Sequence, residues 1–376
     1  MLHLDAIRFF AAMAIVLYHW SEYFISKTGQ SLAPHLRYLG FVVDLFFIIS
    51  GVVLSRVYLN RLSTVKEFGS FFRRRIARLY PLHLLTFLFM AAYGLAVTFL
   101  RIPCHYPEAY GLDGVLPNLF LLQSFGIVPH NTFNGPSWSI SAEMFCYICL
   151  PAILFLYRRN PWIPAILSMC VIGLLTIYCT GLDWTKWSFN HGFLQAIPEF
   201  LFGVTLAGSG RWLSRIPFPN YLFGLLSGLF VILGFLGTPR GYVYALVYLI
   251  AIAAYAADVQ KSSSAFINRV APLGILTYSI YMLHALFQPV FFGFLFHKVH
   301  ATPLINDLMI VLCFFPMIFV SYISYKYFET PARRWLSGRR SVSATRSVPK
   351  TALADTPHID SEIWDSPSPA NLAVSD

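Results

Sequence analysis

The chain alternates between long apolar segments and short polar ones. Ten of the apolar segments approach 20 residues, the length an α-helix needs to cross about 30 Å of hydrocarbon. The predicted spans are 5–25, 39–58, 80–100, 137–157, 162–180, 191–208, 221–237, 241–257, 272–296 and 304–328. A further apolar segment, 115–128, is too short to cross comfortably and is expected to be re-entrant or interfacial. The pattern predicts an all-α, polytopic transmembrane bundle of about ten spans.

Composition supports the same class of protein. The 376 residues are 57% hydrophobic and only 12% charged, whereas an average soluble domain carries about a quarter charged residues. Asp5 and Arg8 precede the first apolar run and no small-residue cleavage site follows Trp20, so the run is expected to be a retained span. We expect a transmembrane domain over residues 1–336. Residues 337–376, basic and then rich in Ser, Thr, Pro and Asp, are predicted to form a disordered tail.

The distribution of basic residues predicts the orientation. If the N-terminus is inside, the inner segments hold 21 of the 27 lysines and arginines. The six on the outer side are Lys27, Arg37, Arg101, Lys186, Arg240 and Lys298. Because positive residues concentrate on the cytoplasmic side of membrane proteins, both termini are predicted to be cytoplasmic. The net charge of +10 is therefore explained by the orientation of the chain in the membrane, and no nucleic-acid partner is expected.

Ionisable side chains inside the predicted spans are the first candidates for function, since such residues are rare in lipid. The set is Arg8, His19, Asp44, Glu143, Glu199 and His284. His19 lies about 16 Å along the helix from Arg8. Asp44 and Glu143 fall in the outer half of the membrane, and Glu199 and His284 near its middle. Their overlapping depths predict one water-accessible cavity. The alternative is a set of separate hydrogen bonds and ion pairs that stabilise helix packing.

A second candidate is the basic stretch RRRIAR at the inner end of the third span. Arg75 and Arg78 are three residues apart and share a helix face, with Arg73 and Arg74 beside them. Paired guanidinium groups of this kind bind phosphate. The alternative is an anchor that contacts lipid head groups.

A third candidate is PSWSISAEMF at the outer end of the fourth span. Ser137 is placed to cap the helix, and Ser139, Ser141 and Glu143 bring polar atoms into its first turns. The alternative is an ordinary serine-capped helix with a buried glutamate. Cys146 and Cys149 are expected to be buried thiols, and no zinc-ligand spacing is found.

These motifs resemble, in order, those of the acyltransferase family 3 membrane proteins. The resemblance runs from residue 3 to about 336 through LDAIRFFAAMAIVLYHW, FVVDLFFIISGVVLS, RRRIARLYPL, PSWSISAEMFCYICLP, LGILTYSIYMLH and FETPARRWL. Two departures stand out: Ala6-Ile7 where many relatives have Gly-Leu, and Met144 where a second acidic residue is common.

The resemblance implies an acyltransferase of the bacterial inner membrane. Its donor would be a cytoplasmic acyl-CoA, usually acetyl-CoA, and its acceptor a hydroxyl of a cell-surface, exported or lipid-linked glycan. His19 would be a general base, since imidazole titrates near pH 6.5, or an acylated nucleophile, with Asp44 or Glu143 orienting it. The donor phosphates would bind Arg75 and Arg78, aided by Arg8 and Arg74. The acceptor-binding candidates are Trp138, Ser139, Glu199, Tyr281 and His284.

No metal is expected, and the oligomeric state stays open. A proton-coupled transporter or flippase is the competing class, because buried Glu and His residues also relay protons. No repeat of the kind common in carriers is found.

Overall fold

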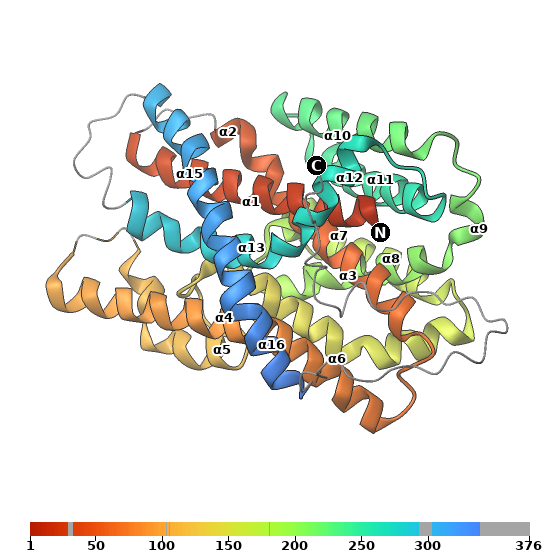
Figure 1. Cartoon of the computed structure of the whole chain (residues 1–376), viewed down its shortest axis with the longest axis horizontal. Helices are drawn as coiled ribbons and strands as arrows, with labels where there is room; N and C mark the ends of the chain where they lie inside the picture. Colours follow the sequence, from red (N-terminus) through yellow and green to blue (C-terminus); the bar gives the residue numbers. More distant parts are fainter. Residues whose placement is uncertain (29–32, 103, 105, 180, 293–302, 339–376) are drawn as a thin grey trace, which may run out of the picture. The chain divides into compact units, whose positions relative to one another are not determined.

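The computed structural model describes residues 1–28, 33–102, 104, 106–179, 181–292 and 303–338. Within these ranges the chain is almost entirely helical, and the only β-pairing is an isolated bridge between Phe125 and Asn190 (Figure 1). The all-α class is therefore confirmed for the described residues. The predicted tail from residue 339 onward lies outside the described residues.

The helices follow one another with short connections. In chain order they are α1 Leu2–Thr28, α2 Ala33–Leu36, α3 Val42–Tyr58, α4 Val65–Leu100, α5 Val115–Leu119, α6 Trp138–Arg159, α7 Ile163–Tyr178, α8 Gly192–Gly208, α9 Gly210–Leu213, α10 Pro219–Phe235, α11 Arg240–Val259, α12 Ala265–Val270, α13 Thr277–Phe287, α15 Pro303–Ile323 and α16 Thr330–Ser337. Short 3-10 turns precede α3, α6 and α13 (η1 Arg37–Phe41, η4 Gly135–Ser137 and η6 Ala271–Leu276). Two π-helical turns, η7 Gln288–Phe292 and η8 Ser324–Glu329, follow α13 and α15.

Every predicted span overlaps an apolar helix, although residues 293–296 of the span 272–296 lie outside the described residues. Seven helical segments of the described chain are long and apolar enough to cross a membrane. The other three are shorter: Ile163–Tyr178, Gly192–Gly208 and Pro219–Phe235. They match the predicted spans 162–180, 191–208 and 221–237. The structure thus gives seven candidate spans, while the count of ten and the cytoplasmic termini stay predictions.

The boundaries of one span were predicted poorly. The third span was expected to begin at residue 80, but α4 begins at Val65. Thr64 and Glu67 form a capping box there, in which each side chain bonds the other's backbone N–H. Because this start lies well before the apolar run, all the arginines of the basic stretch are inside the helix.

The segment 115–128 lies alongside α4. The His83 ring bonds the Asn118 carbonyl at 2.9 Å, and the Tyr80 hydroxyl donates to the Leu119 carbonyl at 3.0 Å. Farther along α4, the Phe87 and Phe133 rings meet at 4.8 Å. These contacts all lie along the candidate span Val65–Leu100, and whether the segment is re-entrant or interfacial stays a prediction.

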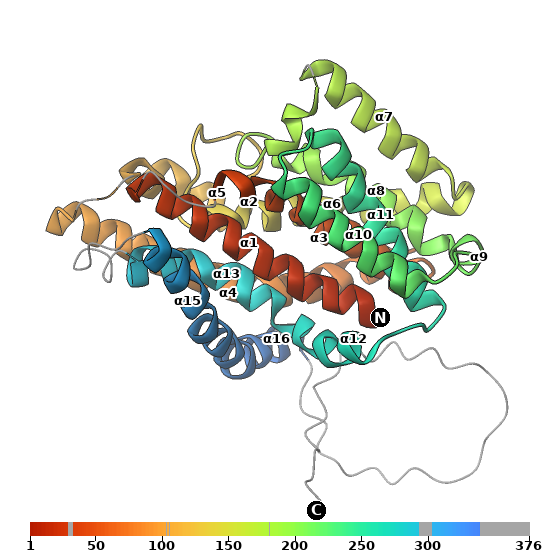
Figure 2. The same ribbon diagram turned by 90° about the horizontal axis from the view of Figure 1, so that it is seen from above.

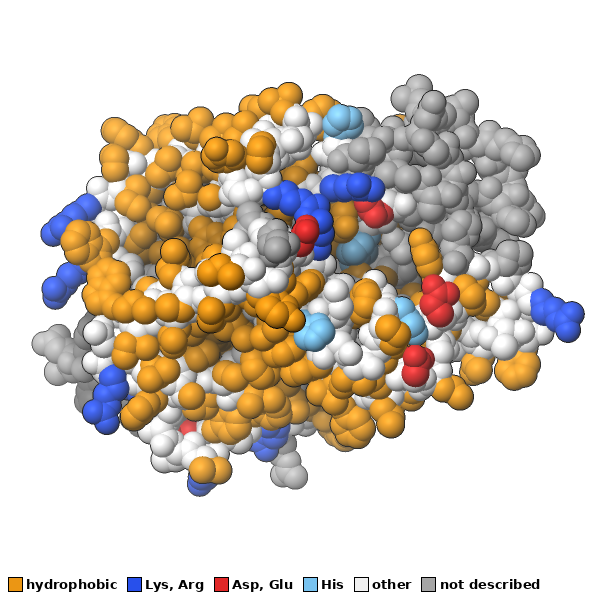
Figure 3. Space-filling model, turned by 180° about the vertical axis from the view of Figure 1, so that it is seen from behind, with side chains coloured by type: hydrophobic (Ala, Val, Ile, Leu, Met, Phe, Trp, Pro, Cys, Tyr) orange, Lys and Arg blue, Asp and Glu red, His pale blue; other side chains and the backbone are white. Residues whose placement is uncertain are grey.

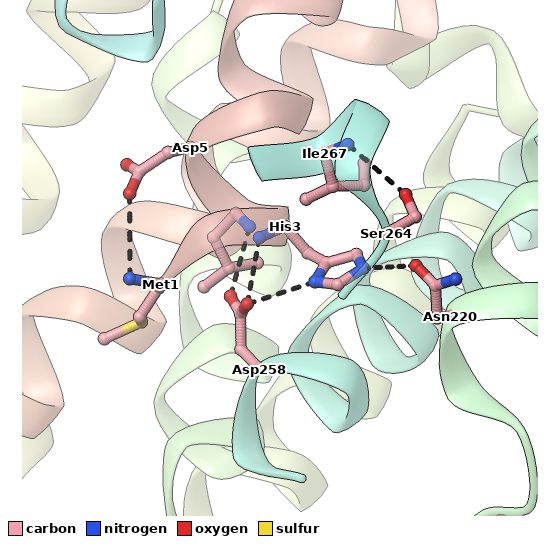
Figure 4. A network of polar contacts seen from close by, with 8 residues as sticks. Met1, His3, Asp5, Asn220, Asp258, Ser264 and Ile267 are labelled. Atoms are coloured by element: carbon pink, nitrogen blue, oxygen red, sulfur yellow. Dashed lines mark hydrogen bonds and ion pairs between the residues drawn. The ribbon is translucent and has the colours of Figure 1, made fainter. Parts of the chain in front are cut away.

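Helix α1 is fixed at its beginning by α11. The Asp258 carboxylate accepts the backbone N–H groups of His3 and Leu4 at 2.9 and 3.2 Å, and the His3 ring lies between Asp258 and Asn220 (Figure 4). Unpaired N–H groups of a first helical turn are stabilised by an acceptor of this kind. Helix α1 then packs against α3, α13 and α15 (Figure 2), so this anchor sets the position of every residue along it.

Helices α3 and α8 cross at very short range. A Cβ atom at Gly51 would overlap the carbonyl oxygen of Phe200, and one at Gly203 would overlap that of Ile48. Small residues at such a crossing let two helix backbones touch, which is typical of membrane bundles. The outer surface carries many exposed apolar side chains, among them Phe99 and Tyr178, and one face is mostly hydrophobic (Figure 3).

Candidate active site

A cavity of about 1860 Å³ opens beside the first helix. It is larger than the roughly 300–1,000 Å³ of ordinary small-molecule pockets. Its wall includes His19 of α1, Trp138 of α6, Gln195 of α8, and Tyr281 and Gln288 at the end of α13. Further aromatic side chains line it: Tyr18, Tyr38, Tyr93, Tyr106, Tyr110 and Trp187. Figure 3 shows basic, acidic and histidine side chains gathered near the middle of an otherwise apolar face.

His19 is held on the cavity wall by α13. Its ring stacks on that of His284, with centroids 5.2 Å apart and 25° between planes. Its carbonyl oxygen accepts a hydrogen bond from Gln288 Nε2 at 3.0 Å. In return, Trp20 Nε1 donates to the His284 carbonyl at 3.1 Å. The two histidines predicted to be functional are therefore brought together, and reciprocal side-chain bonds fix the two helices around them.

His284 itself is fully buried and does not line the cavity. Neither of its ring nitrogens has a hydrogen-bond partner among the described residues. The rings of His19 and Tyr281 cover it, the latter at 5.8 Å. The structure thus places His284 behind His19, rather than in the acceptor-contacting position that was expected.

Trp138 and Tyr281 line the cavity, whereas Ser139 does not line it and instead hydrogen-bonds Tyr281. The Tyr281 hydroxyl donates to the Pro136 carbonyl at 3.1 Å and accepts from Ser139 Oγ at 2.8 Å. Ser137 occupies the N-cap position of α6, but its side chain makes no capping bond. Instead its Oγ accepts from Gln123 at 3.0 Å. The predicted serine cap is therefore wrong, because the segment before α6 folds back and takes the hydroxyl.

A second cluster joins α1, α3, α4 and α6. Glu143 accepts hydrogen bonds from Ser50 and, at 2.6 Å, from Tyr147. The Arg8 guanidinium interacts electrostatically with Glu143 and with Arg78. Arg75 also interacts electrostatically with Glu143. Two arginines from two helices therefore act on one glutamate, and Arg78 lies close enough to Arg8 to act on it.

The Arg75 guanidinium sits in an aromatic cage. The rings of Tyr58, Phe71 and Tyr147 lie 5.7, 5.7 and 5.8 Å from its central carbon. Its Nε has no hydrogen-bond partner among the described residues. Arg74, by contrast, donates to Ser70 at 2.8 Å and to Tyr58 at 3.4 Å. The cage fixes Arg75 in place by cation–π contact.

Asp44 and Glu199 form a third cluster, away from the histidines. Asp44 accepts a hydrogen bond from Gln195 at 2.9 Å, and Glu199 accepts from Tyr244 at 2.5 Å. Among the described residues, neither Asp44 nor Glu143 hydrogen-bonds the His19 ring. The structure thus divides the polar residues among three clusters instead of the single cavity expected, and brings neither carboxylate to His19 as an orienting partner.

Sequence reasoning missed two residues of the site, Gln195 and Gln288. Both are uncharged amides inside apolar helices, so the search for ionisable groups passed over them. The turn that begins at Gln288 is π-helical, a feature often found at functional sites, but no pattern in the sequence indicated it. The six cysteines are all unpaired thiols. No group of three or more His, Cys, Asp or Glu that could hold a metal occurs in the described part of the chain.

Fold and site together define a helical membrane protein in which α1 carries both His19, on the wall of a large cavity, and Arg8, part of a basic cluster with arginines of α4. Residues 1–326 match the family model described as an acyltransferase domain. Since the match covers most of the chain, the protein belongs to acyltransferase family 3.

Two curated relatives are similar over parts of the chain. Acyltransferase MdmB of Streptomyces mycarofaciens is 34% identical over 181 residues, 45% of this chain and 44% of that protein. Protein 2 in the picA locus of Rhizobium radiobacter is 35% identical over 157 residues, 38% of this chain and 75% of that protein. The similarity therefore spans less than half the length of MdmB. No solved structure matches the chain.

Proposed function

We propose that this protein is a membrane O-acyltransferase. It moves an acyl group, in the simplest case acetyl, from cytoplasmic acyl-CoA to a hydroxyl of a cell-surface or exported glycan. The observation that carries the proposal is the arrangement of α1. This helix contributes Arg8 to the arginine cluster and His19 to the cavity wall. Eleven residues of helix separate them by about 16 Å, so an extended thioester arm can join the two sites.

The arginine cluster suits the phosphates of the donor. Arg8 and Arg75 interact electrostatically with Glu143, and Arg78 interacts with Arg8 and with Glu329. Positive charges outnumber the carboxylates, so an anion completes the cluster. The aromatic cage fixes the Arg75 guanidinium in one position before the donor binds, which lowers the entropy cost of binding its phosphates. Arg74, which is hydrogen-bonded to Ser70, would contact the donor phosphates at the edge of the arginine cluster.

His19 would act as the general base for acyl transfer. Its imidazole takes the proton of the acceptor hydroxyl, whose oxygen attacks the thioester carbonyl. The carbon–sulfur bond then breaks, and the departing CoA sulfur takes the proton from the imidazolium. The products are an ester and free CoA thiol. Stacking on His284 keeps the ring orientation that this step needs. Trp138 and Tyr281 would contact a sugar ring in the cavity.

The test measures transfer of labelled acetyl from acetyl-CoA, and the acyl content of surface glycans by mass spectrometry. His19→Ala is expected to abolish incorporation, a loss of at least about 100-fold for a general base. Arg75→Ala/Arg78→Ala is expected to raise the acetyl-CoA concentration needed for half-maximal rate. His35→Ala, which removes an exposed imidazole bound to the Phe235 carbonyl, is the matched control. Full incorporation by His19→Ala would contradict the assigned role.

A proton-coupled transporter or flippase is the second candidate, and the buried pair Asp44 and Glu199 favours it. An assay in detergent micelles distinguishes the two functions, because no proton gradient exists there to drive transport. An acyltransferase still forms an ester from acyl-CoA and a soluble acceptor there. A transporter binds its substrate without consuming acyl-CoA. Release of free CoA thiol that depends on His19 supports transfer, and its absence with every donor supports transport.

A further inference from the structure

Asp44 of α3 and Glu199 of α8 are two buried acidic side chains without a basic partner. Both are 0% exposed, and they are close enough to interact electrostatically. No lysine, arginine or histidine of the described residues forms an ion pair with either. Their polar neighbours are the amide of Gln195 and the hydroxyls of Tyr244 and Tyr248. The Cys146 thiol of α6 also faces Glu199.

The hydrogen bonds of this cluster leave acceptors in excess. Gln195 donates to Asp44 Oδ1 at 2.9 Å. Tyr244 and Tyr248 donate to Glu199 Oε1 at 2.5 and 3.3 Å. Three oxygens remain without a donor among the described residues: Asp44 Oδ2, Glu199 Oε2 and Gln195 Oε1. Buried acceptors without a donor are costly, and two neighbouring buried negative charges without a counter-ion are more so.

The helices cannot relieve this arrangement by moving apart. Gln195 and Glu199 are four residues apart on α8, so they share the face that meets Asp44. The same two helices touch through their backbones at Gly51 and Gly203. The close crossing therefore keeps the carboxylates together, and something other than the described side chains must compensate them.

We propose that Asp44 and Glu199 form a proton-binding carboxyl pair, which holds one proton between its two carboxyl groups. One bound proton turns an acceptor oxygen into a donor, so it satisfies two of the orphaned atoms and removes one negative charge. A proton also needs no ligands beyond the two carboxyl groups, whereas a calcium ion takes six to eight oxygens. The proposal does not depend on acyl transfer.

The pair is linked to the cavity through one side chain. Gln195 lines the cavity and also donates to Asp44. A cavity occupant that draws the Gln195 amide toward itself removes this donor from Asp44, so the shared proton is then held more tightly. Binding in the cavity and proton binding at the pair are therefore coupled, and the coupling is reciprocal.

The test is infrared spectroscopy of the purified full chain in lipid nanodiscs at neutral pH. Protonated carboxylic acids absorb apart from carboxylates. The spectrum of wild type minus that of Asp44→Asn/Glu199→Gln is expected to contain one protonated-acid band. Subtraction removes every other carboxyl group. Ser168→Ala, which deletes a buried hydroxyl bound to the Pro198 carbonyl of α8, is the control and is expected to retain the band.

Glu199→Gln alone serves if the double variant does not fold, and it must shift or remove the same band. Equal protonated-acid absorption in wild type and variants would show that both carboxylates are ionised, which overturns the proposal. A band that appears only when sodium and potassium are withdrawn would show that a metal cation holds the site, which also overturns it.

Discussion

At the scale of single residues, the site is built from ionisable side chains that meet across helices. The His19 ring stacks on that of His284, and Arg8 and Arg75 interact electrostatically with Glu143. The sequence predicted all five as functional candidates because they are ionisable groups in or beside apolar helices. The partner of each group could not be predicted. Depth along a helix says nothing about rotation around its axis, and rotation decides that Glu143 faces Arg8 rather than His19.

Gln288 is a positioning residue for His19. The sequence could not indicate this role, because it does not show which way a side chain is rotated about the helix axis. Its only described bond to α1 goes to the His19 carbonyl, so Gln288→Ala is expected to displace the imidazole. If His19 is the base, kcat falls by roughly fivefold, from the loss of one hydrogen bond worth about 1 kcal/mol. The KM for acyl-CoA stays constant because the arginine cluster is untouched. Steady-state kinetics measure both.

Gln260→Ala is the matched control for this prediction. Gln260 also donates to backbone carbonyls, those of Leu213 and Ile216 at 2.8 and 2.9 Å, but far from the cavity. Its loss is expected to lower stability without changing kcat. Equal effects of the two substitutions on kcat would mean that Gln288 acts only through general stability.

At the scale of helices, the continuous apolar runs predicted where the helices lie but not how long they are. Each predicted span has its helix, yet α4 extends 36 residues. The capping box at Thr64 and Glu67 starts it in polar sequence, where a hydropathy search has no signal. The segment 115–128 could be placed only by its contacts with Tyr80 and His83 on α4.

The crossing of α3 and α8 gives a prediction at this scale. Gly51→Ala is expected to destabilise the bundle by about 1–3 kcal/mol, as overpacking does, because its methyl group meets the Phe200 carbonyl. Gly224→Ala on α10, where a Cβ would meet nothing within 4 Å, is expected to be neutral or stabilising by up to about 1 kcal/mol. Thermal unfolding in detergent compares them, and equal midpoints would contradict the close packing.

At the scale of the molecule, the basic residues divide the bundle into two unlike ends. Near the start of α4, Arg158 donates to Ser63 Oγ at 3.3 Å and to the Leu62 carbonyl. This places two of the segments predicted to be cytoplasmic together. Arg37, predicted to be outside, pairs with Glu22 at 3.2 Å. Lys186 and Arg240 both pair with Asp183. Three of the six outer basic residues thus lie beside two carboxylates, which neutralise two of the outer positive charges and strengthen the charge asymmetry.

This asymmetry predicts the topology, and cysteine labelling tests it. In a chain whose six native cysteines are replaced by alanine, Glu108→Cys marks the wall of the cavity and Lys66→Cys the start of α4. A membrane-impermeant maleimide is expected to label Glu108→Cys in intact cells. It is expected to reach Lys66→Cys only after permeabilisation, because positive charge holds that end in the cytoplasm. The reverse pattern would invert the orientation. It would also place the arginine cluster on the side opposite cytoplasmic acyl-CoA. An inverted topology would therefore contradict the proposed donor site as well.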